Sequence, residues 1–163
     1  MALQTIAGMI LALSLAPLSD CAVKDTNKNN LRKLAGRWNA QFSFDESGAK
    51  VSLEDSDYFM VLVFKEDTLV TLTGKISDGL QKAYKETSRI TLDTSKRPKW
   101  LDVAVQDGES KGKTFYGIYE LDGDSLRICW CSTGRDRPRQ FKSNEEQGHN
   151  LLSFKRLKPT KSK

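Results

Sequence analysis

The feature that most constrains the fold is a pair of alternating runs around a short turn, at residues 114–121 and 125–131. In both runs successive side chains fall on opposite faces, and a period of two is the pattern of a β-strand. The residues between them include Asp122 and Gly123. Asp-Gly is a strong hairpin signal, because glycine adopts the positive φ of a tight turn without steric cost. The stretch therefore predicts an antiparallel hairpin.

Similar strand signals recur along the rest of the chain. They lie at residues 36–44, 50–53, 58–65, 68–73, 75–92, 100–105 and 150–157, with a short helical stretch at 30–35. Sequential antiparallel strands that close on themselves leave no exposed edge. We therefore predict an all-β fold, an up-and-down antiparallel barrel of about eight strands preceded by a short N-terminal helical turn.

A chain of 163 residues, 38% apolar and 29% charged, has the size and composition of one soluble globular domain. We divide it into an export segment at 1–22, a linker at 23–30, the barrel at 31–157 and a basic tail at 158–163. The formal net charge of +5 is matched by the basic residues of the C-terminal end, where no acid occurs: Lys155, Arg156, Lys158, Lys161 and Lys163. The excess is thus a property of the tail, and we expect no nucleic-acid partner.

Residues 2–18 are apolar and carry no charge. This run favours a secretory signal over a retained anchor or a buried helix, so we expect an exported protein that is periplasmic, envelope-associated or secreted. Cys21 follows Leu18, Ser19 and Asp20, an arrangement that resembles a lipoprotein cleavage box except that Asp20 is not small. Two interpretations stand, lipidation of Cys21 with a membrane tether, and ordinary signal cleavage beside it.

Few residues suggest chemistry. The chain has one histidine, His149, in a polar stretch, and it lacks a Gly-x-Ser-x-Gly elbow, a phosphate-binding glycine loop and a His-Glu-x-x-His pair. Cys129 and Cys131 would lie about 7 Å apart on one strand face, which is an incomplete metal site and a poor disulfide. We expect no enzyme, no metal and no cofactor. An organised cluster of polar groups around His149 or Arg137 would support the hypothesis of an enzyme again.

Bulky side chains are expected to face the barrel interior. They are the candidate pocket residues Phe42, Phe44, Met60, Leu62, Phe64, Tyr119, Leu126, Ile128, Trp130 and Phe154. An eight-stranded barrel has room for a packed interior or for one small ligand. Two functions therefore stand: a monomer that binds a small apolar ligand, and a filled barrel that serves as an interaction or structural module for cell-envelope proteins.

A set of residues between 31 and 157 carries a resemblance to a known family. It comprises Leu34, Gly36 and Trp38, the turn at 93–99, Leu101, Asp102, residues 112–114, 117–120 and 122–124, Leu126, Ile128, Cys129, Gly134, Arg137, Pro138 and Phe141. In these positions the chain resembles small exported domains that are abundant in Planctomycetes bacteria and are described as lipocalin-like. The family supplies no established activity, cofactor or catalytic residue.

Gly36, Arg37 and Trp38 also resemble the opening signature of true lipocalins. This resemblance implies that Trp38 plugs the closed end of the barrel and that Arg156 packs on its ring by a cation–π contact. The residues that we expect to have structural roles are Gly36, Trp38, Gly117, Tyr119, Asp122, Gly123, Arg137, Pro138, Phe141 and Arg156.

Overall fold

The computed structural model describes residues 19–53, 56–77, 80–134 and 136–158. Within them the chain forms one helix, α1 (Ser19–Leu34), and nine strands. The strands are β1 (Gly36–Phe44), β2 (Lys50–Ser52), β3 (Tyr58–Lys65), β4 (Thr68–Ser77), β5 (Leu80–Asp93), β6 (Lys99–Val105), β7 (Thr114–Asp122), β8 (Ser125–Cys131) and β9 (His149–Leu157). Most of the expected export segment, the side chain of Cys21 and the tail after residue 158 lie outside the described residues.

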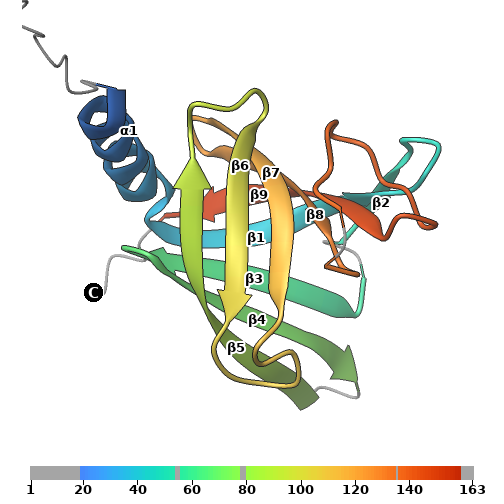
Figure 1. Cartoon of the computed structure of the whole chain (residues 1–163). Helices are drawn as coiled ribbons and strands as arrows, with labels where there is room; N and C mark the ends of the chain where they lie inside the picture. The colour runs from blue at the N-terminus through green and yellow to red at the C-terminus, as the bar shows by residue number, and fades with distance from the viewer. Residues whose placement is uncertain (1–18, 54–55, 78–79, 135, 159–163) are drawn as a thin grey trace, which may run out of the picture.

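The sheet closes into a barrel because β1 pairs with two partners, β3 and β9. Each strand from β3 to β8 pairs antiparallel with the next one along the chain. The result is a closed eight-stranded antiparallel barrel, and β2 is an extra strand on the end of β1 (Figure 1). The predicted fold class is confirmed.

The hairpin of β7 and β8 forms at the expected turn. Asp122 pairs with Ser125, and Gly123 between them has a φ of 54°. This left-handed conformation costs glycine little, which explains its use at the turn. Further along the pair, Tyr119 lies opposite Ile128, and both are buried in the barrel.

Strand β1 contains an irregularity that reverses its alternation. Ala40 pairs with Phe154 and Phe42 with Ser153, so β1 advances two residues while β9 advances one. This is a β-bulge, and the extra residue turns the side chains that follow it to the other face of the sheet. The bulge is not visible in the sequence, where the apolar alternation of residues 38–44 continues without a break.

The predicted interior placement of Phe42 and Phe44 is therefore wrong. Phe44 packs against a small cluster on the outer face of the barrel, which we call the outer cluster: Ile118, Cys129 and Leu151. Phe42 does not belong to the barrel core, and the Lys50 ammonium group lies 5.1 Å from the centre of its ring. Both phenylalanines follow the bulge and take the outer face for that reason.

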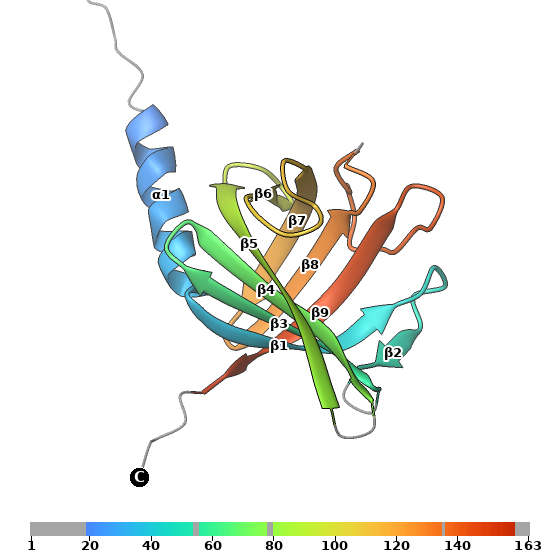
Figure 2. The same cartoon turned by 90° about the horizontal axis from the view of Figure 1, so that it is seen from below.

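The segment 23–30, predicted as a linker, is helical and belongs to α1, which runs along one side of the barrel (Figure 2). The side-chain oxygen of Asn27 accepts hydrogen bonds from the backbone and the hydroxyl of Thr94, at 3.0 and 2.6 Å. Asn30, three residues later, is buried and accepts from the Tyr119 hydroxyl at 3.3 Å. The inward stripe of α1 thus begins with asparagines, and a search for apolar periodicity misses it. No helix among the described residues has the length and apolar character to cross a membrane.

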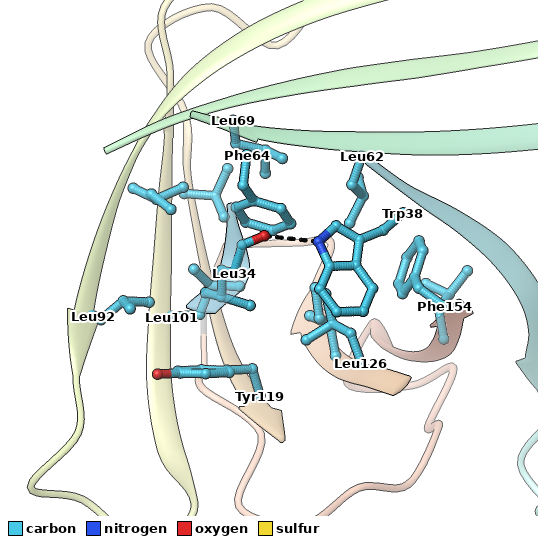
Figure 3. Packing of buried hydrophobic residues seen from close by; sticks show 14 of the residues in the cluster. Leu34, Trp38, Leu62, Phe64, Leu69, Leu92, Leu101, Tyr119, Leu126 and Phe154 are labelled. Carbon is cyan, nitrogen blue, oxygen red and sulfur yellow. Dashed lines mark hydrogen bonds between the residues drawn. The ribbon is translucent and has the colours of Figure 1, made fainter. Parts of the chain in front are cut away.

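Trp38 occupies the end of the barrel beside α1 and is completely buried. Its ring nitrogen donates a hydrogen bond to the Leu34 carbonyl at 2.8 Å, drawn in Figure 3. The Arg156 guanidinium lies 4.1 Å from the centre of the ring, and it donates to the carbonyls of Lys33 and Ala35 at 2.6 Å each. Because the last carbonyls of a helix lack partners within it, one arginine stabilises both the tryptophan and the helix end.

Replacing Trp38 by alanine should lower the free energy of unfolding by about 3–5 kcal/mol, because it leaves a cavity in a packed core. Urea denaturation followed by circular dichroism measures this loss. Trp130→Ala is the matched variant, and it should cost clearly less, since Trp130 is only partly buried. Equal losses in the two variants would show that Trp38 has no special role in closing the barrel.

Candidate functional site

The interior of the barrel is packed in the half beside α1, which we call the closed half. Six of the predicted pocket residues lie there and are no more than 2% exposed: Leu62, Phe64, Tyr119, Leu126, Ile128 and Phe154. They pack around Trp38 in one cluster, part of which is drawn in Figure 3. These six residues are therefore core residues.

The other half of the interior, the open half, contains a cavity of about 550 Å³. Its apolar wall consists of Met60, Leu69, Val103, Phe115 and Trp130. Of the predicted pocket residues, Met60 and Trp130 line this cavity. Cavities of roughly 300–1,000 Å³ are typical of small-molecule sites. The barrel interior is thus only partly filled by its own side chains.

Polar side chains from β4 and β5 form another part of the cavity wall. Thr71 pairs with Glu86 and Thr73 with Tyr84, and all four line the cavity. The two threonines share a face with Leu69, because side chains alternate along a strand. This alternation is present in the sequence, but a search for bulky apolar side chains passes over threonine.

The connection between β6 and β7 forms an edge of the cavity through Gly108 and Ser110. It is tied to β5, because the Asp107 carboxylate accepts a hydrogen bond from the Thr87 backbone at 2.5 Å, and the Gln106 backbone donates to the Thr87 carbonyl at 2.8 Å. The hydrogen bond from Thr87 lowers the pKa of Asp107. The hydrogen bond between the Asp107 carboxylate and Thr87 therefore stabilises this connection fully above the ordinary aspartate pKa. Its contribution is lost as the pH falls through the lowered pKa of Asp107.

A buried hydroxyl lies next to the cavity wall. Ser88 is 1% exposed, and it pairs with Leu69, which lines the cavity. Its oxygen has no hydrogen-bond partner among the described residues. The hydroxyl of Ser143 is also buried but has two hydrogen-bond partners. It donates to the Phe44 carbonyl and accepts from the Leu151 backbone at 3.1 Å.

A second hollow, which we call the outer groove, lies on the outside of the barrel and measures about 910 Å³. It lies between the turn that joins β5 to β6 and the segment that joins β8 to β9. Its charged or aromatic lining comprises Arg97, Trp100, Asp136, Arg137, Arg139 and Lys142, and His149 lines it as well. His149 and Arg137 therefore share one groove. The ring nitrogen Nε2 of His149 lies 3.3 Å from the Asp136 backbone carbonyl.

Arg137 fastens the segment after β8 to the barrel wall. Its guanidinium lies 4.3 Å from the ring centre of Trp100 and 5.2 Å from that of Tyr116. It donates to the Gly117 carbonyl at 2.6 Å and to the Asp102 carboxylate at 2.5 Å. With a side chain only 16% exposed, Arg137 has a structural role in this groove.

Other residues that we expected to have structural roles support the same wall of the barrel. Pro138 is fully buried, and Phe141 packs against the outer cluster. Gly117 lies where strands approach closely, since a Cβ there would be 3.1 Å from the Cys129 carbonyl oxygen and 3.3 Å from that of Leu101. Only glycine avoids this crowding, which gives Gly117 a structural role at this point of the sheet.

Cys129 and Cys131 are both buried. Burial raises the pKa of the Cys129 thiol to about 11, so that it stays protonated at neutral pH and is a poor nucleophile. Within the described part of the chain, no group of three or more histidine, cysteine or acidic side chains could hold a metal ion.

Comparison of the chain with models of protein families, with curated proteins and with solved structures finds no significant match. The role of the cavity and of the outer groove is therefore argued from their own geometry.

Replacing Ser88 by alanine should raise the free energy of unfolding by about 1 kcal/mol, because it removes a buried hydroxyl that lacks a partner. Ser143→Ala should instead lower it by about 1–2 kcal/mol, since two backbone groups lose their partner. Urea denaturation of both variants measures the two changes. A loss of stability in Ser88→Ala similar to that in Ser143→Ala would show that the Ser88 hydroxyl is satisfied in solution.

Proposed function

We propose that the protein is an exported, lipocalin-like barrel that binds one small amphipathic molecule in its open half, without a chemical step. The observation that carries the proposal is the cavity of about 550 Å³ with walls of two kinds. Export is supported by the apolar, uncharged run at residues 2–18.

The chemistry of the walls supports an amphipathic ligand more than a purely apolar one. Phe115 and Trp130 offer broad apolar surface to the body of a ligand, while Thr71, Thr73 and Glu86 offer hydroxyl and carboxylate groups. A few placed polar groups in a mostly apolar pocket typically fix the orientation of a ligand. We therefore assign to the ligand an apolar body and one polar end that donates hydrogen bonds.

The alternative, a filled barrel that acts only through its surface, is less well supported. The closed half is packed by Trp38 and its neighbours, and this packing alone closes that end. The side chains of the open half leave room for a ligand, although a longer side chain at Thr71 or Val103 would fill it. A barrel selected only for rigidity gains nothing from such a space, because unfilled volume costs stability.

The neutral dye N-phenyl-1-naphthylamine tests the proposal. It should bind the full chain saturably, with increased fluorescence and energy transfer from Trp130, which lines the cavity. Thr71→Phe places a bulky ring in the cavity and should weaken binding by about tenfold or more. Thr91→Phe is the matched control, because Thr91 is exposed on β5 and does not line the cavity, and it should bind as the unchanged protein does.

Dye binding that is absent, or that survives unchanged in Thr71→Phe, would contradict the cavity as the binding site. Circular dichroism confirms that both variants are folded.

Native mass spectrometry of the full chain, purified gently after expression with export, should show a reproducible excess of mass that disappears on denaturation. Identification of the released molecule then tests its amphipathic character. Bare protein mass at every step would favour the filled-barrel alternative.

A further inference from the structure

The outer groove carries a second inference, independent of the cavity and of the ligand proposed for it. We propose that the outer groove binds a small soluble molecule with two or more phosphate or carboxylate groups. The groove lies on the outside of the barrel, and its lining shares no residue with that of the cavity.

The charge of the groove is the first observation. Four basic side chains line it, Arg97, Arg137, Arg139 and Lys142, against one acid, Asp136. Arg137 is neutralised by Asp102 at 2.5 Å. Arg97, Arg139 and Lys142 form no ion pair within the described part of the chain, and all three are exposed. Three available cations beside one anion favour a ligand that is itself multiply negative.

The donors also fit oxyanions in geometry. Arginine presents a planar fork that matches phosphate and carboxylate oxygens, and lysine adds a compact charge. One nitrogen of Arg97, Nη1, donates to the carbonyls of Thr94 and Lys96 at 2.8 Å each, which fixes the side chain along the turn. The groove therefore presents one basic group that is already oriented from the turn and two from the segment after β8.

The wall behind these cations is firm. Arg137 is held between Trp100 and Tyr116 and bonded to Gly117, while Pro138 is buried. Arg139 and Lys142 belong to the segment that these contacts fasten to the barrel. A fixed scaffold lowers the entropy lost on binding, which favours a specific site over diffuse attraction.

The surroundings favour a small soluble ligand over a nucleic acid or a membrane. The ring of Trp100 in the groove lining already has Arg137 at 4.3 Å and Lys96 at 5.0 Å from its centre, and both cations compete with a nucleic-acid base for its surface. A membrane-binding face would add exposed apolar side chains. The large ones among the described residues all lie outside the groove: Val51, Tyr58, Ile76, Tyr84 and Leu157.

Isothermal titration calorimetry of the full chain with inorganic tripolyphosphate and with citrate tests the proposal. At least one probe should bind at a single site, with an affinity that falls as sodium chloride is raised. The double variant Arg139→Gln/Lys142→Gln should weaken binding by about tenfold or more, because two charge-assisted contacts are lost. Its binding of N-phenyl-1-naphthylamine should be unchanged, which separates the groove from the cavity.

A matched control removes the same two charges elsewhere. Arg32→Gln/Lys155→Gln changes one exposed residue on α1 and one on β9, neither of which lines the groove, and should alter affinity by less than about twofold. Equal weakening in both double variants would overturn the site in favour of general surface charge. No saturable binding of either probe up to about 1 mM would overturn it as well. Tighter binding to phosphatidylglycerol vesicles than to tripolyphosphate, lost in the groove variant, would overturn the small-molecule assignment in favour of a lipid surface.

Discussion

The stack of Arg156 on Trp38 is the interaction on which the closed barrel depends. The arginine comes from β9 and the tryptophan from β1, the two strands whose pairing completes the circle. The same guanidinium donates to the carbonyls of Lys33 and Ala35 at the end of α1 and pairs with Asp124 at 3.1 Å, in the turn between β7 and β8. Since a planar guanidinium donates in several directions at once, this side chain of β9 joins two other parts of the chain that are distant in sequence, the junction of α1 with β1 and the turn between β7 and β8.

The fold was predictable because several strands of this chain show a period of two and end at recognisable turns. The hairpin around Gly123 has both signals, and the structure has it at that place. The bulge in β1 has no such sequence signal, because apolar residues continue to alternate through the inserted residue. The start of α1 was hidden for a related reason, since Asn27 and Asn30 face the barrel through hydrogen bonds and not through apolar contact.

The candidate sites were harder to predict than the fold, because each depends on pairings that a linear pattern does not contain. Bulky interior residues such as Leu126 fill the barrel, whereas the cavity takes its character from smaller and polar ones such as Thr71. The outer groove could not be predicted from the net charge of the chain. Outside residues 155–163 the charges of the chain cancel in sum, yet the fold gathers Arg97, Arg139 and Lys142 in one place. Net charge describes the molecule at a distance and does not locate charge on its surface.

The bulge in β1 also determines where the barrel can yield. Before the bulge, one edge of β1 pairs with β3 from Gly36 to Asn39, and beyond the bulge it pairs with β2 instead, whereas β9 pairs with β1 from Arg37 to Phe44. The first residues of β3, including Met60 in the cavity wall, are therefore joined to β4 but not to β1. Among the described residues the wall thus has a seam that is bonded in the closed half and unbonded in the open half. The rim of the open half can therefore widen at this seam without breaking the pairing of β1 with β3 from Gly36 to Asn39.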